Sequence, residues 1–469
     1  MDFFTPIPDI LERADEAIDF SSAEIRVIVG PAQKCFHVHE SLIRKYSPYF
    51  KTALDGTWRE GKRGVVEMVE DDEQAFNIYM NWLYRKKIHL DMPDITNRTE
   101  ELDAAWIRLF STYALGDKLL DSYFKDALTD ATVFCVARFG LPPVEALHFL
   151  YDMTPPESPM RLLMTCELAR RHDQINALDE SWPHALTIDL TKLLKFHNEY
   201  ANQPTFQVAR NCGFHEHKNR GLQTETCYRA NASHPDQVVQ QVRLRRNGTI
   251  DFTTSPVRFS FENSSAILSI NERLLRMCQP ALDLSVETTT AGTRTLRADC
   301  HEHALNTYLN WLCSGRMYID FNYGCNDPAI WVKIARAYAL GSRLPDSTFK
   351  DALTDAVALM FVQPRYDYLI WIPSSLAMLQ HPEVYQLLSV ESPLSNILAH
   401  AIASVNNLAE QLSEHWPQRL LYAVAFVAAK MLYEEDPAPM EHAQRCMFHE
   451  HGSEEECYRR DMGSFMESR

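Results

Sequence analysis

Two stretches of the chain bring cysteines and histidines together at spacings that suit a metal ion. The first is spaced C-x2-H-x-H-x9-C, and its candidate ligands are Cys212, His215, His217 and Cys227. The second is spaced C-x2-H-x-H-x5-C, and its candidate ligands are Cys446, His449, His451 and Cys457. Four thiolate and imidazole ligands suit tetrahedral Zn²⁺, and a complete set of four leaves no open position for a reacting water. The pattern therefore predicts a structural zinc ion in each stretch.

Two other interpretations of these stretches stay open at the level of sequence. A zinc-dependent enzyme would use the clusters as its metal centres, but it would need an open coordination position and a general base, which the pattern does not supply. Alternatively, no metal is bound. In that case Phe214 and Phe448 anchor the stretches by packing, and the polar residues cap the end of a helical region.

The rest of the chain offers no catalytic signature. It contains no glycine-rich phosphate loop, no Gly-x-Ser-x-Gly, no His-Glu-x-x-His and no Cys-x-x-Cys. Acidic pairs such as Asp71-Asp72 are common because the chain has 63 Asp and Glu, and none stands beside a candidate nucleophile. We therefore expect a protein that is not an enzyme.

The charge of the chain argues against a nucleic-acid partner. Its 46 Lys and Arg against 63 Asp and Glu give a net charge of −17, which repels a phosphate backbone. The longest apolar stretch, between Arg419 and Lys430, is too short to span a membrane. Because the N-terminal sequence lacks the basic and apolar regions of a signal peptide, the expected location is the cytoplasm, the nucleus or both.

The chain contains two copies of one unit. The segment YALGDKLLDSYFKDALTDA, which begins at Tyr113, returns as YALGSRLPDSTFKDALTDA at Tyr338. YMNWLY at Tyr79 returns as YLNWLC at Tyr308, and the two Cys/His stretches are a further matched pair. Several matches in the same order exclude chance. The sequence therefore predicts a tandem duplication of a unit of roughly 230 residues.

The order of elements in the first copy predicts an α+β domain. Alternating apolar residues predict strands at 24–30, 35–40 and 64–70. Apolar residues at helical spacing predict helices at 41–54, 71–87, 101–116 and 121–137. Ser41 is the expected N-cap of the first helix. Two strands, a helix, a strand and further helices form an α+β domain rather than a doubly wound sheet.

This order of elements resembles the BTB/POZ domain. The resemblance is carried by FHVHESLIRKYSPYF at residues 36–50 and AFNIYMNWLY at residues 75–84. Together with the helical tail and the Cys/His stretch, these motifs make the chain similar to BTB-containing proteins of filamentous fungi. The resemblance implies two BTB/POZ-like domains, each a small sheet with packed helices, and each followed by a helical tail.

The second copy keeps the framework of the first but not its signature. PVRFSF at residues 256–261 predicts its first strand, while LSINE and CQPAL replace the histidine-bearing and Ser-Pro-Tyr-Phe segments. We interpret it as a degenerate BTB-like domain kept for packing or pairing. The predicted divisions are an N-terminal arm at 1–20, a BTB/POZ domain at 21–137, a helical tail at 138–231, a linker at 232–253, a degenerate BTB-like domain at 254–362 and a second helical tail at 363–469.

The resemblance implies that the chain binds proteins. BTB domains form dimers or larger oligomers, and many recruit a cullin scaffold as substrate adaptors of ubiquitin ligases. Cullin-binding members often carry hydrophobic-x-Glu after the second helix, and Trp58, Arg59 and Glu60 stand at that place. An exposed Trp58 would anchor a partner, because aromatic residues dominate interface energetics. The alternative is that Trp58 folds back onto its own domain.

Dimerisation through N-terminal residues is the other property that the resemblance implies. The segment from Asp9 to Phe20 has apolar residues close to a helical period, which suits docking on its own domain or on a partner. Two units in one chain can also pair with each other, because the tether raises their effective concentration. A chromatin-associated BTB regulator is a further alternative, against which the net charge of −17 and the lack of a zinc-finger array argue.

Overall fold

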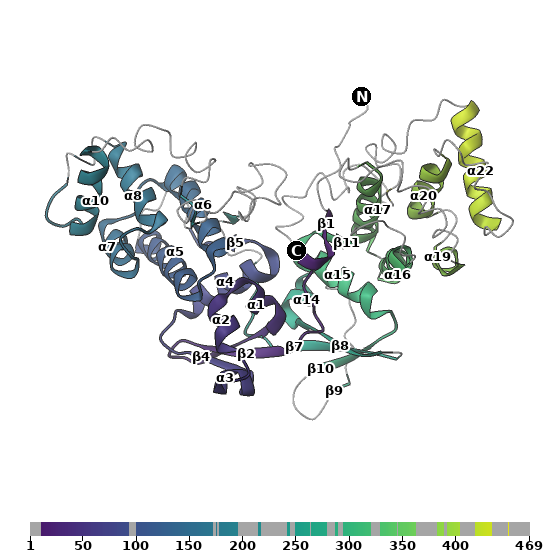
Figure 1. Ribbon diagram of the computed structural model, residues 1–469, viewed down its shortest axis with the longest axis horizontal. Helices are drawn as coiled ribbons and strands as arrows, with labels where there is room; N and C mark the ends of the chain where they lie inside the picture. Colours follow the sequence, from purple (N-terminus) through teal and green to yellow (C-terminus); the bar gives the residue numbers. More distant parts are fainter. Residues whose placement is uncertain are drawn as a thin grey trace. The chain divides into compact units, whose positions relative to one another are not determined.

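The computed structural model divides the chain into two compact units, drawn in Figure 1. We call Ser22–Ser255 the first unit, and Met1–Ser21 together with Pro256–Arg469 the second unit. The structure describes residues 11–92, 100–171, 175, 178–195, 214–216, 242–243, 249–262, 264–278, 287–288, 294–319, 329–344, 346–362, 382–388, 392–403, 418–433 and 449. The division assigns the N-terminal arm to the second unit, and residues 249–253 of the predicted linker to the first.

The first unit is built on a three-stranded mixed sheet in the order β3-β2-β4. The central strand β2 (Glu24–Val29) pairs antiparallel with β3 (Lys34–His39) and parallel with β4 (Val65–Met68). Alternate residues of β2 are buried, as expected for a sheet with one covered face. Three helices lie over that face in Figure 1, namely α1 (Glu40–Tyr46), α2 (Pro48–Ala53) and α4 (Glu73–Arg85).

The helix predicted over 41–54 is divided into α1 and α2. Helix α1 has His39 as its N-cap, so the prediction of Ser41 for that position was wrong, and the Ser41 hydroxyl donates to another serine side chain instead. The break falls at Ser47, whose backbone is extended. Ser47 precedes Pro48, and a proline ring disfavours the helical conformation in the residue before it.

The remaining helices of the first unit pack side by side, beginning from α4. Helix α5 (Glu100–Leu119) contacts α4, α6 (Ser122–Phe139) and α7 (Val144–Met153), and α8 (Pro159–Ala169) contacts α6 and α10 (His184–Lys195). The short helix α3 (Arg59–Arg63) lies next to β4. In Figure 1 the helices α7, α8 and α10 extend away from the sheet. The expected helical tail of the first copy is therefore present in the described residues up to 195.

The second unit repeats the arrangement with a four-stranded sheet in the order β8-β7-β10-β9. Strand β7 pairs antiparallel with β8 and parallel with β10, as β2 does with β3 and β4. Its strands are β7 (Pro256–Phe261), β8 (Ser264–Asn271), β9 (Glu287–Thr288) and β10 (Arg294–Ala298). Its helices are α14 (Glu272–Cys278), α15 (Glu302–Ser314), α16 (Ala329–Arg343), α17 (Ser347–Val362), α19 (Pro382–Leu387), α20 (Pro393–Ala403) and α22 (Gln418–Tyr433). The prediction of an α+β fold is confirmed.

Buried polar contacts are duplicated together with the elements. The Tyr79 hydroxyl donates to Asp121 Oδ2 at 3.2 Å, and the Tyr308 hydroxyl donates to Asp346 Oδ2 at 3.0 Å. Each aspartate also accepts a backbone N–H in the first turn of the helix that follows it, α6 or α17. Burial raises the pKa of Asp121 to about 6, although these hydrogen bonds oppose the shift.

Among the helices in the described part of the chain, none is long and apolar enough to cross a membrane.

Candidate functional site

Each copy of the duplicated sequence is preceded by a short segment that packs with the other copy. We call these two the exchanged segments. Strand β1 (Leu11–Arg13) pairs in parallel with β11 (Met317–Ile319), and in Figure 1 the purple β1 lies beside the green β11. Strand β6 (Val242–Arg243) pairs in parallel with β5 (Ile88–His89) in the first unit. Because β5 follows α4 just as β11 follows α15, the two exchanged segments occupy equivalent places.

The N-terminal arm is not the helix that its apolar spacing suggests. After strand β1 it forms a single 3-10 turn, Ala14–Glu16, and then runs on without α-helix to Phe20. The backbone N–H of Ser269 donates to the Phe20 carbonyl at 2.9 Å. Hydrogen bonds to β11 and to Ser269 of β8 replace those that a helix would make within itself. Tertiary contacts therefore override the helical spacing of the apolar residues in this segment.

Both exchanged segments contain the tripeptide Ile-Asp-Phe, at residues 18–20 and 250–252. The Ile and Phe side chains are buried in each case, and those of Ile250 and Phe252 are fully buried. The Phe252 ring stacks on Tyr84 of α4 with ring centroids 4.9 Å apart. Burial of one such side chain contributes about 1.5–3 kcal/mol. The tripeptide is therefore the apolar anchor of each exchanged segment.

One asparagine in each unit holds the backbone of the exchanged isoleucine. Asn81 Oδ1 accepts from the Ile250 N–H at 3.1 Å, and Asn81 Nδ2 donates to the Ile250 carbonyl at 2.9 Å. Asn310 makes the same two bonds to Ile18, at 2.8 and 3.0 Å. Asn81 and Asn310 are nearly fully buried. A side-chain amide offers both a donor and an acceptor, so it can replace a neighbouring strand for a single residue.

A second asparagine, one helical turn earlier, holds the phenylalanine of the tripeptide. The Phe252 N–H donates to Asn77 Oδ1 at 3.2 Å, and the Phe20 N–H donates to Asn306 Oδ1 at 3.3 Å. The repeated Asn-x-x-x-Asn pair and the Ile-Asp-Phe tripeptide were both visible in the sequence. Neither indicates a contact while the segments before each unit are taken as an arm and a linker.

A second repeated contact joins the Cys/His stretch of the first unit to helix α6. The His215 ring is fully buried, with Nε2 at 3.1 Å from Asp130 Oδ1 and Nδ1 at 3.8 Å from Asp126 Oδ2. The Glu216 backbone N–H donates to Asp126 Oδ1 at 2.7 Å. Phe214 is also fully buried. Of the three described residues, His215 contacts α6 through its ring and Glu216 through its backbone, and Phe214 is buried.

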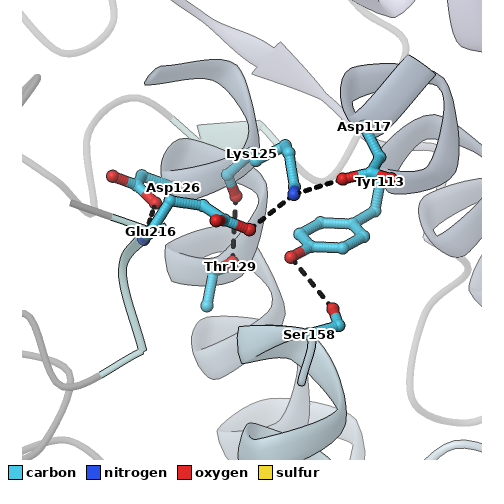
Figure 2. A network of polar contacts seen from close by, with 7 residues as sticks. All are labelled: Tyr113, Asp117, Lys125, Asp126, Thr129, Ser158 and Glu216. Atoms are coloured by element: carbon cyan, nitrogen blue, oxygen red, sulfur yellow. Dashed lines mark hydrogen bonds and ion pairs between the residues drawn. The ribbon is translucent and has the colours of Figure 1, made fainter. Parts of the chain in front are cut away.

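Lys125 completes this contact, as Figure 2 shows. Its ammonium group lies 2.5 Å from Glu216 Oε1 and 2.6 Å from Asp117 Oδ1. It also lies 5.2 Å from the centre of the Tyr113 ring, a distance that suits a cation–π contact. Burial, and then the charge of Glu216, raise the pKa of Tyr113 well above its ordinary value. Within the network the Lys125 and Glu216 side chains are buried, whereas Asp117 is partly exposed.

The second unit repeats the histidine contact. His449 Nε2 lies 2.9 Å from Asp355 Oδ1, and His449 Nδ1 lies 3.9 Å from Asp351 Oδ2. Asp351 and Asp355 belong to the second FKDALTDA sequence, in α17. In the sequence, that repeat is first of all evidence of duplication. Its charged residues lie on a largely apolar helix, and this was the available signal that they are buried against another segment.

The structure describes two of the eight predicted metal ligands, His215 and His449. The other six lie outside the described residues, namely Cys212, His217, Cys227, Cys446, His451 and Cys457. Within the part of the chain that the structure describes, there is no group of three or more His, Cys, Asp or Glu side chains that could hold a metal ion. Structural zinc therefore stays a prediction, and the residues present show His215 and His449 facing carboxylates.

The predicted partner-binding residues lie at the start of α3. Trp58 is its N-cap, and 57% of its surface is exposed, so the alternative in which this side chain folds back onto the domain is wrong. Next to it is a concave site of about 510 Å³, lined by α2, α3 and the sheet. Its charged lining residues are Arg26, Arg59, Glu60, Arg63 and Glu67. Two of the three predicted residues, Arg59 and Glu60, therefore line a surface cavity.

No protein-family model, curated protein or solved structure matches the chain.

Proposed function

We propose that the chain is a non-enzymatic protein-interaction scaffold made of two BTB-like units. The observation that carries this proposal is the reciprocal exchange of Ile-Asp-Phe segments, in which Asn81 and Asn310 hold the backbone of Ile250 and Ile18. Such a site recognises an extended peptide by shape and backbone hydrogen bonding and contains no reacting group. Self-association through the residues before the first strand is also what the resemblance to BTB domains implies.

The elements of each unit support the same class of fold. Each has a three-stranded mixed core sheet whose central strand is antiparallel to the next strand and parallel to the third, with helices on one face. The second unit keeps this framework without the histidine-bearing signature of the first. We infer that the degenerate copy serves as a permanent internal partner, which supplies one exchanged segment and receives the other.

The surface around Trp58 supports the recruitment of a further protein. Trp58 is the most exposed tryptophan in the described residues, and it precedes two charged residues that line a cavity. A cullin scaffold is the partner that the resemblance proposes for this place, which would make the chain a substrate adaptor of a ubiquitin ligase. The buried histidine contacts favour a structural over a catalytic use of the Cys/His stretches.

A pull-down with purified cullin tests the adaptor function. We expect the wild-type chain to retain cullin and Trp58→Ala to lose at least tenfold of the retained amount, because a central aromatic anchor typically contributes about 2 kcal/mol or more. Tyr422→Ala is the matched control, since Tyr422 on α22 is also exposed, at 69%. Absence of retention by the wild-type chain, or equal retention by wild type and Trp58→Ala, would contradict the adaptor proposal.

A further inference from the structure

Strand β4 is an open edge of the first-unit sheet. The Gly64 carbonyl accepts from Arg26 N–H at 2.9 Å, and the Met68 carbonyl accepts from Gly30 N–H at 3.0 Å, so these carbonyls point toward β2. Successive residues of a strand direct their backbone groups to opposite sides, so Val65 and Glu67 direct theirs away from β2. Among the residues that the structure describes, neither has a backbone partner on that side.

The second unit shows what fits this kind of edge. Its strand β10 pairs with β7 in parallel, as β4 does with β2, but β10 carries a further strand on its other side. That strand is β9, which runs antiparallel to β10 with Thr288 opposite Arg294 and Glu287 opposite Thr295. In the first unit the element before β4 is helix α3 instead. The duplicated edge therefore has an internal occupant in one unit and none described in the other.

The charge around the open edge is opposite in sign to that of the whole chain. Arg59 and Arg63 lie one turn apart on α3 and, with the exposed Arg26 of β2, line the cavity beside β4. No ion pair or side-chain hydrogen bond is formed by these three arginines with any residue that the structure describes. The cavity also contains Glu60 and Glu67, so its net charge is positive, whereas the chain carries −17.

We propose that β4 accepts an extended acidic segment of a partner protein as an added antiparallel strand. The partner backbone pairs with the outward groups of Val65 and Glu67, and its carboxylates face Arg59 and Arg63. Strand addition obtains affinity from main-chain hydrogen bonds and specificity from side chains on alternate residues, and guanidinium–carboxylate pairs are strong and directional. This inference rests on the proposed interaction function, because it defines the chemistry of a partner for the same surface.

Fluorescence anisotropy with a labelled eight-residue peptide, in which aspartate alternates with valine, tests the inference. We expect saturable binding of this peptide to the wild-type chain. When asparagine replaces each aspartate, we expect the affinity to fall by at least about tenfold, because the charge-assisted bonds are lost. The double variant Arg59→Glu with Arg63→Glu should weaken binding by a similar factor. The matched control is Lys192→Glu with Lys333→Glu, which reverses two exposed charges that do not line the cavity and should bind as wild type.

A peptide that is N-methylated at alternate residues separates strand addition from charge attraction alone. It keeps every carboxylate but cannot donate along one edge, so we expect its binding to be lost. Equal binding of the methylated peptide, equal binding of the asparagine peptide, or absence of binding by the aspartate peptide would overturn the inference. All three of these measurements use the wild-type chain and do not depend on how a variant folds. The assay contains no cullin, so its failure leaves the adaptor proposal intact.

Discussion

Buried polar and charged residues join each Cys/His stretch to a helix of its own unit. His215 lies between Asp126 and Asp130, and Lys125 lies between Asp117 and Glu216, all on or against α6. Burial of such groups is costly unless each has a partner, and removal of one partner leaves an uncompensated group behind. The contact therefore specifies where the Cys/His stretch docks, whether or not the undescribed cysteines bind zinc.

Substitution of His215 tests this role. His215→Ala should lower the free energy of unfolding by about 3 kcal/mol, because two buried carboxylates lose the ring between them. Urea denaturation followed by circular dichroism measures the loss. His148→Ala is the control, since His148 is exposed and donates a single hydrogen bond from its ring to the Ser181 carbonyl, so its loss should stay below about 1 kcal/mol. Equal losses in the two variants would show that the buried His215 contact contributes no more to the free energy of unfolding than the exposed His148 contact does.

At the residue scale the sequence singles out the two histidines but does not indicate their partners. The types and spacing of His215 and His449 indicated a site, and both histidines do lie in a repeated buried contact. Their described partners are aspartates that lie 85 and 94 residues earlier in the chain. Spacing within a motif carries no information about such distant partners, which depend on how helices pack.

At the scale of elements, the exchanged segments are the most informative feature of the structure. Each combines a short parallel strand with an Ile-Asp-Phe anchor, and each docks on an equivalent helix, α4 or α15. Strands of two or three residues have little stability of their own. Their order therefore depends on the buried Ile and Phe side chains and on the asparagine bonds.

Removal of a single asparagine should release one segment and leave the other in place. In Asn310→Ala the backbone of Ile18 loses both bonds, so amides of residues 11–20 should exchange with solvent at least tenfold faster, in line with roughly 1–3 kcal/mol for unsatisfied buried groups. Asn81→Ala should act in the same way on residues 249–252 alone. Hydrogen-exchange mass spectrometry compares the two variants, each serving as the control for the other. Simultaneous release of both segments in either variant would contradict separate docking.

The elements themselves were largely predictable, and their boundaries were less so. The strand and helix order of the first unit follows the apolar periods, because those periods reflect which face of each element is buried. The division of the helix over 41–54 followed from Pro48, which was visible in the sequence. The strand at Leu11–Arg13 could not be predicted, since its hydrogen-bond partner β11 lies more than 300 residues later.

At the scale of the whole molecule, each copy of the duplicated sequence packs with the segment that precedes the other copy. Residues 1–21, which include the predicted N-terminal arm at 1–20, belong to the second unit, and the segment before Pro256 belongs to the first. One chain supplies both exchanged segments and both of the sites that bind them. We therefore infer that these sites are occupied without a second copy of the chain. Among the described residues, the surfaces that we propose for other proteins are the edge of β4 and the exposed Trp58. The sequence predicted the two units, but not which unit each leading segment joins, because connectivity alone does not determine that choice.

The mass of the protein in solution tests this account most directly. Size-exclusion chromatography with multi-angle light scattering, over a range of concentrations, should give a single species at the chain mass of 54.0 kDa, because an exchange within one chain does not depend on concentration. A species at twice that mass which grows with concentration would show that the leading segments are exchanged between chains, and would contradict the internal exchange.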